Sequence, residues 1–376
     1  MDPTEVNVPD VKDMNIDNIT QNTILINSQC ESERVKYLFE RLVTHLHDFA
    51  RETRLSTQEW KVALDFLVTV GQISSDVRHE FILLSDILGL SLLVDAIDHP
   101  KPPSSTGPTF IVFIGRMQHN TATQEFILLS DILGLSLLVD AIDHPKPPSS
   151  TEGSVLGPFH SHEAELVPSG GDISSDPKGN PCLVLCTIKD PSGAPIEGVK
   201  IDIWETDSSG HYDVQYAERD GPDGRCVMTS DEEGRFWFKA IVPVSYPIPH
   251  DGPVGKLLKL LKRHPWRPAH MHFMFEKDGW DHLITALYIH PDPYLTSDAV
   301  FGVKDSLIES LGSVSAEQAK EYGVQEGTAL ISRDFVLVSD DETQRLRDSN
   351  ALTAMADLFP GKKVKLVDHL PVPDLD

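Results

Sequence analysis

A stretch of 27 residues occurs twice in this 376-residue chain without a single difference. Residues 80–106 read EFILLSDILGLSLLVDAIDHPKPPSST, and residues 125–151 repeat them at an offset of 45. Both copies are rich in leucine and isoleucine, so each needs an apolar groove, and identical side chains need the same groove. Solenoid repeats drift in sequence and need about three units for a shared core, so this pair does not predict a repeat fold. It indicates a very recent duplication or an error in the gene model, and the copy without a groove would be an exposed, aggregation-prone helix.

The N-terminal part of the chain is predicted to be helical. Between about residues 31 and 51, apolar residues recur with the i, i+3, i+4 spacing of an amphipathic helix. The segment Ser56-Thr-Gln-Glu59 is a capping-box pattern that begins a second helix, and a third helix follows Ser75. Residues 1–28 are polar and are predicted to be a flexible arm. The helical module is therefore expected to span residues 29–151.

From about Val155 the chain changes to short runs that alternate apolar and polar residues between Gly, Pro and Asp turns. At least six strands are predicted: Leu183–Lys189, Val199–Trp204, Arg235–Val242, His270–Glu276, His282–His290 and Ala329–Val338. This spacing favours an antiparallel sandwich. The expected fold is mainly β, an antiparallel β-sandwich over 152–340 behind the all-helical module, with 341–376 as a tail along the surface.

The composition excludes several classes of partner. The chain has 32 Lys and Arg against 58 Asp and Glu, a formal charge of −26, which disfavours nucleic-acid phosphates and anionic lipid surfaces. Its 4 cysteines include no C-x-x-C pair, so neither a disulfide framework nor a zinc ribbon is indicated. The N-terminus lacks the apolar segment of a secretory signal, and no apolar stretch reaches the roughly 20 residues of a membrane span. We expect a cytoplasmic protein without nucleic-acid or membrane partners.

The sharpest local motif is Arg267-Pro-Ala-His270-Met-His272-Phe. On a strand, residues i and i+2 point to the same face, so the imidazoles of His270 and His272 can reach one metal ion. The alternative is that both are half-buried histidines paired with the backbone. No cysteine or nearby carboxylate completes the usual zinc or non-haem Fe(II) sets.

Two tyrosines lie in turn-rich segments and are candidates for the missing ligands. Tyr212 follows a predicted strand in WETDSSGHYD, and Tyr246 lies among prolines in YPIPHDGPVG, where a regular strand or helix is disfavoured. Phenolates are hard anionic donors that suit a ferric ion. Two phenolates and two imidazoles would form an Fe(III) site with room for a chelating substrate, whereas the alternative for either tyrosine is aromatic packing at the edge of the sandwich.

These three segments, in this order and together with LGPF at Leu156–Phe159, resemble the ligand segments of the intradiol ring-cleavage dioxygenases. The resemblance covers about Phe39–Val338, apart from the extra 45 residues. It implies a β-sandwich with a helical N-terminal dimerisation module and a homodimer formed through those helices, with a lipid at the interface.

The resemblance also implies the roles of the motif residues. One Fe(III) per subunit would be held by Tyr212, Tyr246, His270 and His272. Tyr246 matches the ligand that the incoming diol displaces and would then act as the base, and Arg267 would stabilise negative charge on the ring. Without the resemblance, a structural ion pair is an equal alternative for Arg267. The substrates would be an aromatic diol or triol and O₂.

The substrate pocket of this family is lined from several segments. Here the matching positions are Val155, Gly157, Pro158, Phe159, Ile248, Pro249 and Val300, with Leu128 and Asp131 on the third helix or Leu83 and Asp86 in the identical copy. The second copy is preferred for the pocket because it runs directly into SVLGPF. An aspartate at the rim could hydrogen-bond a third ring hydroxyl, although a solvent-facing helix residue is its alternative.

The YPIP segment, SGHYDVQY and Val300 resemble hydroxyquinol 1,2-dioxygenases more than catechol enzymes. We therefore predict cleavage of hydroxyquinol (benzene-1,2,4-triol) to 3-hydroxy-cis,cis-muconate, the enol of maleylacetate. Catechol 1,2-dioxygenase, giving cis,cis-muconate, is the first alternative. A non-catalytic β-sandwich binding protein and a dioxygenase damaged by the duplication are the others.

Overall fold

The computed structural model of the chain describes residues 8–11, 13–75, 77–98, 121–218, 221–358, 360, 364–367 and 370–373. The chain divides into two compact units. Unit 1 comprises Met1–Thr57 and Leu128–Asp376, and unit 2 comprises Gln58–Ile127. The division falls inside the helical module expected over 29–151, because the first copy of the repeat lies in unit 2 and most of the second copy in unit 1.

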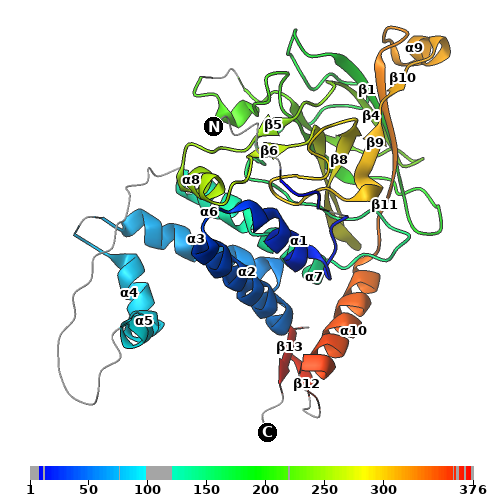
Figure 1. Cartoon of the computed structure of the whole chain (residues 1–376). Helices are drawn as coiled ribbons and strands as arrows, with labels where there is room; N and C mark the ends of the chain where they lie inside the picture. The colour runs from blue at the N-terminus through cyan, green and yellow to red at the C-terminus, as the bar shows by residue number, and fades with distance from the viewer. Residues whose placement is uncertain are drawn as a thin grey trace, which may run out of the picture. The chain divides into compact units, whose positions relative to one another are not determined.

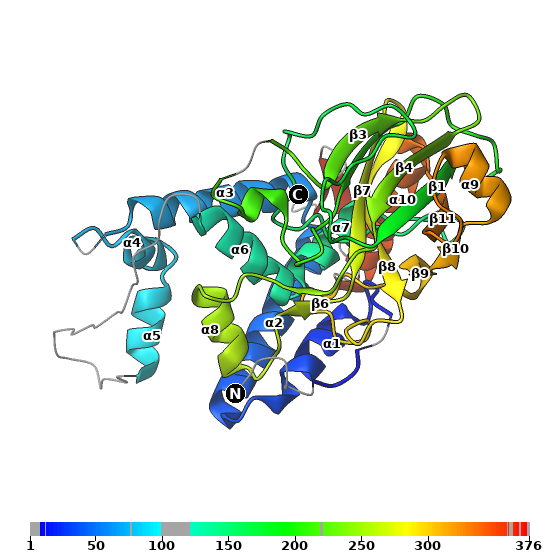
Figure 2. The ribbon, with the colours of Figure 1, turned by 90° about the horizontal axis from the view of Figure 1, so that it is seen from above.

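Unit 1 is built around two β-sheets (Figures 1 and 2). The first has the strand order β10-β11-β1-β4, with β1 at Pro181–Lys189, β4 at Arg235–Ile241, β10 at Gly312–Ser313 and β11 at Ala329–Val336. The second has the order β3-β2-β7-β8-β9, with β2 at Lys200–Trp204, β3 at Arg225–Thr229, β7 at His270–Lys277, β8 at Trp280–His290 and β9 at Ile308–Ser310. Apolar side chains from both sheets, among them Phe236, Phe273 and Phe335, form one buried core cluster between them.

All six predicted strands are present, with bounds within two residues of those expected. The sheets are mixed rather than purely antiparallel, because β1 pairs with β11 in parallel and β8 pairs with β9 in parallel. A parallel pair needs a long connection, and here β11 follows β1 by more than a hundred residues of chain. Alternation of residues along a strand carries no information about the direction of its neighbour.

The expected flexible arm over residues 1–28 differs from the described structure. Helix α1 (Ile19–Ile26) is followed by a 3₁₀ turn, η2 (Asn27–Gln29), and by α2 (Glu33–Thr53), whose N-cap Ser32 accepts a hydrogen bond from the N–H of Val35. Ile19 and Ile26 are buried, and Val8, Val11 and Met14 join the same apolar cluster. The few apolar residues of this polar segment therefore hold it against the rest of unit 1.

The C-terminal segment is also more ordered than the expected surface tail. Helix α10 (Asp340–Leu358) buries Ala351 and Met355, and β12 (Val364–Val367) and β13 (Leu370–Pro373) form an antiparallel hairpin. The remaining elements of unit 1 are the ribbon of β5 (Tyr246–Pro247) and β6 (Trp266–Arg267), helices α8 (Pro253–Leu260) and α9 (Ala316–Tyr322), and the 3₁₀ turns η3 (Asp213–Gln215) and η4 (Asp305–Leu307).

Unit 2 contains α3, which begins at the unit boundary (Thr57–Ile73), and the first copy of the repeat as α4 (Glu80–Ile87) and α5 (Leu90–Asp98). The second copy forms α6 (Thr121–Ile132) and α7 (Leu135–Asp143), and α6 crosses the unit boundary. Each copy was expected to form one helix, but each breaks at a glycine with positive φ, Gly89 at 72° and Gly134 at 73°.

The two copies differ completely in burial. In the second copy, Ile132 and Leu138 are both 0% exposed, and Leu128, Leu137 and Ile142 are buried with them. None of the side chains described in the first copy is buried, and Ile87 and Leu92 are each 74% exposed. The groove for this sequence in unit 1 is therefore filled by the second copy.

The expectation of a mainly β protein is not met, since the part of the chain that the structure describes is 37% helix and 23% strand. The described architecture is an N-terminal helical region and a C-terminal β-sheet domain. Helices α1 and α10, which their sequences did not predict, and the duplicated pair α4–α5 account for the excess of helix. No helix in the described ranges has the length and apolar character that crossing a bilayer requires.

Candidate active site

The five motif residues reach one region of unit 1 from four short segments. Tyr212 lies immediately before η3, beyond the end of β2. Tyr246 on β5 is the register partner of Arg267 on β6, so the ribbon places these two residues opposite each other. His270 and His272 are the first and third residues of β7 and share one face of the strand. All five side chains are buried.

The donor atoms of the four candidate ligands converge. The two phenol oxygens of Tyr212 and Tyr246 lie 3.2 Å apart, and the Nε2 atoms of His270 and His272 lie 3.1 Å apart. Nη1 of Arg267 joins the two pairs, at 3.5 Å from the Tyr246 hydroxyl and 2.9 Å from Nε2 of His270. Two nitrogens at this separation can each reach a common point at about 2.1 Å, the usual length of a bond from imidazole to a metal.

The protonation state of the imidazoles suits metal binding. Nδ1 of His270 lies 2.7 Å from the carbonyl oxygen of Pro268 and donates to it, so Nε2 carries the lone pair, which faces Nη1 of Arg267 in this structure. Burial, followed by the nearby Arg267 cation, holds the pKa of His270 well below its ordinary value. Burial also holds the pKa of His272 well below its ordinary value, with His270 and Arg267 adding to the effect. Both rings are therefore neutral ligands at neutral pH.

The two phenols need a cation before they can ionise. Burial raises the pKa of Tyr212 well above its ordinary value, and the neighbouring Tyr246 raises it further. Burial also raises the pKa of Tyr246, although the Arg267 cation opposes this shift. A highly charged metal at the convergence point would supply the missing positive charge. Two neutral imidazoles and two oxygen donors that ionise only beside a cation fit Fe(III).

Arg267 is held by a buried carboxylate that the sequence did not indicate. Its Nε lies 3.1 Å from Oδ1 of Asp298 and its Nη2 lies 3.3 Å from Oδ2, while Nη2 also donates to the hydroxyl of Tyr288 at 3.1 Å. Burial alone would lower the pKa of Arg267, but Asp298, Tyr246 and Tyr288 together more than offset it, and the pKa lies well above its ordinary value. The guanidinium is thus a fixed charge with one edge facing the candidate ligands. The alternative of a structural ion pair for Arg267 is present, and its role as a site residue stays a prediction.

Aromatic rings fix the remaining orientations. Trp204, the last residue of β2 and the register partner of His272, stacks on that imidazole with 4.8 Å between ring centroids and 6° between planes. Phe159 stacks on Tyr212 at 4.8 Å. Trp204 could have been found from the sequence, because it ends a predicted strand directly before the Tyr212 segment. Asp298 and Tyr288 carry no comparable signal, since each depends on long-range packing.

The predicted substrate-contact residues fall into two groups. Those that the structure places in the apolar cluster containing Tyr212 and Tyr246 are Leu128, Val155, Phe159, Ile248 and Val300. Close to them, Gly157 faces the His272 ring, where an added Cβ would lie 3.8 Å from Nε2, and Pro158 and Pro249 are half-buried. Asp131 is 2% exposed and interacts electrostatically with Arg267. Leu83 and Asp86 are exposed in unit 2 and are not brought to this cluster.

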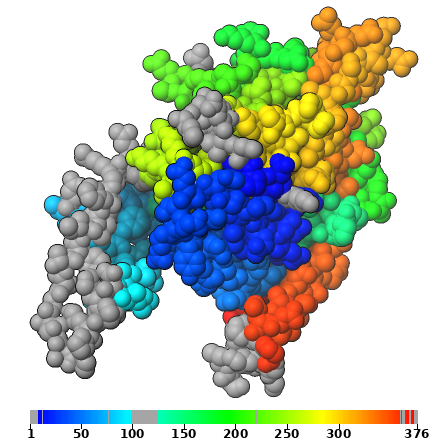
Figure 3. All heavy atoms as spheres, viewed as in Figure 1, coloured from blue at the N-terminus to red at the C-terminus, as the bar shows by residue number. Residues whose placement is uncertain are grey.

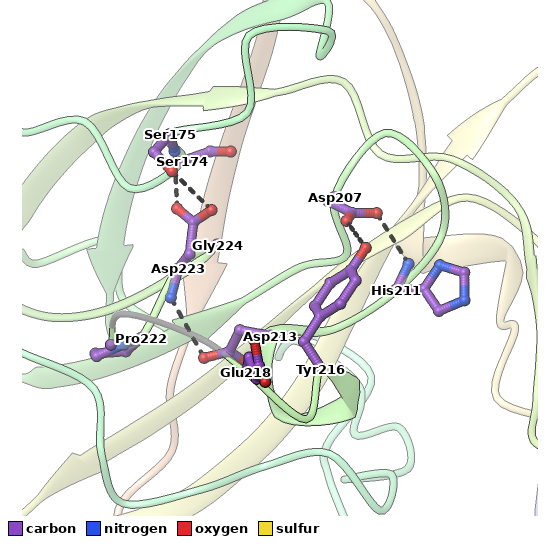
Figure 4. A pocket seen from close by; sticks show the side chains of 11 residues that line it. Ser174, Ser175, Asp207, His211, Asp213, Tyr216, Glu218, Pro222, Asp223 and Gly224 are labelled. Atoms are coloured by element: carbon purple, nitrogen blue, oxygen red, sulfur yellow. Dashed lines mark hydrogen bonds between the residues drawn. The ribbon is translucent and has the colours of Figure 1, made fainter.

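A hollow of about 400 Å³ is lined in part by residues of the Tyr212 segment, but its chemistry differs from that of the candidate ligands (Figure 4). Two of its carboxylates are engaged within its own wall, since Asp207 accepts hydrogen bonds from Tyr216 and from the N–H of His211, and Asp223 accepts from Ser175. Within the described ranges no group of three or more His, Cys, Asp or Glu is arranged to hold a metal. The pair of histidines and the pair of tyrosines therefore form the candidate metal centre.

Comparison with known proteins agrees with the motif analysis. Residues 155–337 match the family profile described as Dioxygenase, and residues 32–107 and 105–151 each match the profile Catechol dioxygenase N terminus. The chain is 61% identical over 376 residues to the intradiol ring-cleavage dioxygenase hqdA of Aspergillus niger, covering 100% of both chains. It is 40% identical to a 6-chlorohydroxyquinol 1,2-dioxygenase of Cupriavidus pinatubonensis, over 77% of this chain and 89% of that protein.

A solved structure extends the likeness to the fold. The hydroxyquinol 1,2-dioxygenase of Pseudomonas putida is 33% identical, with a TM-score of 0.55 over 86% of this chain and 99% of that one. The full-length similarity to hqdA, the two profile matches and the shared fold lead to one conclusion. This chain belongs to the intradiol ring-cleavage dioxygenases, a family of Fe(III) enzymes.

Proposed function

We propose that this protein cleaves benzene-1,2,4-triol with O₂ to 3-hydroxy-cis,cis-muconate, using one Fe(III) per subunit held by Tyr212, Tyr246, His270 and His272. The bond between the two adjacent hydroxyl-bearing carbons breaks, and both atoms of O₂ enter the product. The observation that carries the proposal is the convergence of the two phenol oxygens, 3.2 Å apart, with two imidazole nitrogens, 3.1 Å apart.

When bound, Fe(III) supplies a Lewis-acid centre that chelates the diol and draws electron density from its ring. The other parts of the reaction belong to the protein. Tyr246 is the proposed displaceable ligand, and its Oη takes up a proton that the diol releases. Arg267, 3.5 Å from that oxygen and fixed by Asp298, balances the negative charge that the ring acquires. Phe159 and Ile248 are buried in the same apolar cluster as Tyr212 and would exclude water from the substrate ring.

Asp131 supports a triol rather than a diol as the substrate. This carboxyl is buried beside Arg267, and its Oδ2 has no hydrogen-bond partner among the described residues. A buried, unpaired acceptor is costly, and a third ring hydroxyl is a donor that would satisfy it. Burial raises the pKa of Asp131 to about 6, so the carboxyl is mostly ionised, and a strong acceptor, at neutral pH. The similarity to hydroxyquinol enzymes of two genera points the same way.

The test is oxygen uptake by purified, iron-quantified protein with benzene-1,2,4-triol, catechol and chlorocatechols. We expect the highest kcat/KM with the triol. In the double variant D86N/D131N, which changes both copies of the repeat, kcat/KM for the triol should fall about 10- to 100-fold, the value of a hydrogen bond to a charged group. Catechol turnover should change little, because catechol has no third hydroxyl.

Other outcomes would select the alternatives. A preference for catechol in the parent protein, unaltered by D86N/D131N, would assign the enzyme to catechol. An iron-loaded protein without a visible tyrosinate-to-iron absorption band would contradict the proposed ligand set and favour a non-catalytic binding protein with the same sandwich.

We also propose a homodimer formed through the N-terminal helices, with a lipid at the interface. Helix α2 lies on the surface of unit 1 (Figure 3), and Leu38, Leu42 and Phe49 on it are 47%, 44% and 54% exposed. An apolar face of this kind on a helix is typical of a protein–protein interface. Sedimentation equilibrium should give twice the chain mass, and L42E should give monomers; a monomeric parent protein would refute the dimer.

A further inference from the structure

The apolar face of the first copy has no groove of its own. Over its described length it exposes large apolar side chains on both α4 and α5, namely Leu83, Ile87, Leu88, Leu90, Leu92, Leu93, Val94 and Ile97, which are between 45% and 74% exposed. Their counterparts in the second copy are largely buried in unit 1. The same sequence, as the second copy, therefore fits the groove of unit 1.

The first copy is already folded in the form that fits the groove. Helix α4 ends at Ile87 and α5 begins at Leu90. At the offset of 45, these positions correspond to Ile132, where α6 ends, and Leu135, where α7 begins. The break between the helices has φ of 72° at Gly89 and 73° at Gly134. A hydrogen bond between the two serine hydroxyls crosses the break in both copies, at 2.8 Å in the first and 2.9 Å in the second. Docking would need no refolding of the helix pair.

The groove recognises features that both copies possess. His47 lies 2.9 Å from the carbonyl oxygen of Leu133, and Arg263 donates to the carbonyl oxygen of Ile132 at 2.6 Å. The groove is also close-fitting at the break, because a Cβ added at Gly134 would lie 2.7 Å from Oγ1 of Thr23. The first copy offers the same carbonyls at Leu88 and Ile87 and the same glycine at 89.

Chain connectivity does not favour either copy. The profile of the N-terminal domain matches residues 32–107 without interruption, so the first copy follows the preceding helices in the order that the profile has. Residues 105–151, which contain the second copy, match the same profile again. If the second copy is docked, residues 80–124 are left over, and if the first is docked, residues 107–151 are left over; both segments have 45 residues. Loops of equal length close at about equal entropic cost.

The two copies already meet at one point inside unit 2. The rings of Phe81 and Phe126, which are equivalent residues of the two copies, lie 6.4 Å apart. A Cβ added at Gly71 of α3 would contact both rings, at 3.9 Å and 3.7 Å. The equivalent residues Phe81 and Phe126 therefore both lie close to Gly71 of α3.

We propose that the apolar face of α4–α5 is a second occupant of the groove that α6–α7 fills in this structure, so that either copy can dock within the same chain. In the exchanged state Leu83 and Asp86 take the places of Leu128 and Asp131, and the chemistry of the neighbouring site is unchanged. The exchange does not depend on the proposed reaction, because it rests on sequence identity and on the groove alone.

The test compares I132D with the matched variant I87D and with the double variant I87D/I132D in the full-length chain. An aspartate at a fully buried position destroys docking of that copy. If the copies exchange, I132D loses one of two equivalent states, and its unfolding equilibrium constant in urea rises only about twofold, as should that of I87D. The double variant, with no competent copy, should lose stability by about a hundredfold or more.

Hydrogen exchange identifies the docked copy directly, because the I132D substitution gives the second copy a peptide whose mass differs from that of the first. In I132D the amides of residues 80–98 should become protected and those of 125–143 should lose protection, independently of protein concentration. The proposal is overturned if I132D is as unstable as the double variant, if its first copy stays unprotected, or if it refolds only as a concentration-dependent oligomer.

Discussion

Two imidazoles side by side on β7 are held in different ways. His270 is anchored by its Nδ1 bond to Pro268, the usual arrangement for a metal-binding histidine. Nδ1 of His272 has no hydrogen-bond partner among the described residues, and its ring lies flat on Trp204 instead. Stacking restrains the tilt of the ring, and no hydrogen bond at Nδ1 fixes its rotation within the plane among the described residues.

Replacement of Trp204 should therefore loosen the metal site. We expect W204L to weaken iron binding by about 10- to 100-fold, the usual cost of losing a group that orients a ligand. W204F keeps an aromatic face on His272 and should retain most of the affinity. Iron content after dialysis against a chelator, together with the visible absorption band, measures this. Equal iron retention in W204L and W204F would show that the stack is not needed.

Tyr246 and Tyr212 should be separable by kinetics. In Y246F the proposed base is lost while three ligands remain, so kcat with the triol should fall about 10²- to 10⁴-fold, the usual contribution of a general base. Its iron content should decrease less than that of Y212F, whose ring is not displaced by substrate. Stopped-flow oxygen consumption per bound iron is the measurement, and an unaltered kcat in Y246F would remove the base from the mechanism.

At the scale of elements, His47 joins three segments of the helical region. Its Nδ1 lies 2.9 Å from the hydroxyl of Thr20 on α1, and its Nε2 lies 2.9 Å from the carbonyl oxygen of Leu133 at the break before α7. Nε2 donates to the carbonyl oxygen, and in the neutral ring Nδ1 accepts from the Thr20 hydroxyl. Burial lowers the pKa of His47 from 6.5 to about 4.

This shift makes the helical region sensitive to mild acid. The unfolded chain binds a proton at His47 near pH 6.5, whereas the folded chain binds one only near pH 4. The contribution of His47 to the free energy of unfolding is therefore complete above pH 6.5 and is lost as the pH falls from 6.5 to about 4. The loss amounts to about 3 kcal/mol at most, at 1.36 kcal/mol per pKa unit. The free energy of unfolding, measured in urea, should decrease less between pH 7.5 and pH 5 for H47Q than for the parent chain. Equal decreases would exclude His47 as the cause.

The elements that the sequence predicted are those whose pattern is local. The six strands with alternating apolar residues appear within two residues of their expected bounds, and the helix pattern of residues 31–51 corresponds to α2. Helix α1 was missed because its apolar residues, Ile19 and Ile24–Ile26, do not follow the i, i+3, i+4 spacing, and its burial comes from long-range packing of Ile19 and Ile26. The parallel pairing of β1 with β11 was missed because it depends on tertiary contacts.

The candidate site likewise contains residues that local motifs indicate and residues that only the tertiary structure identifies. His270, His272, Tyr212 and Tyr246 lie in short motifs with distinctive residues. The structure places the two phenol oxygens 3.2 Å apart and the two imidazole nitrogens 3.1 Å apart, and their role as metal ligands stays a prediction. Asp298, which fixes Arg267, is an ordinary aspartate in the sequence and is distinguished only by being buried beside a cation. Spacing therefore indicates the candidate metal ligands, whereas the residues that fix their positions can be found only from the tertiary structure.

For the molecule as a whole, the duplication raises the question of what the chain would be without it. Removing 80–124 and removing 107–151 produce the same 331-residue chain (376 − 45 = 331), because the deleted windows begin at equivalent positions of identical copies. That chain retains one helix pair for one groove. It also lacks the apolar side chains that are exposed on α4 and α5, such as Ile87 and Leu92 at 74% each.

We expect the 331-residue chain to give a higher soluble yield than the parent, because a contiguous exposed apolar surface promotes association. The visible absorption band and iron content per chain should match those of the parent, since all four proposed ligands lie outside the deleted segment. A parent variant with L88K and L92K, which keeps its length but makes the exposed face polar, is the matched control and should recover part of the yield. A fall in yield on deletion, with no gain from L88K/L92K, would mean that the first copy contributes to the stability of the folded chain.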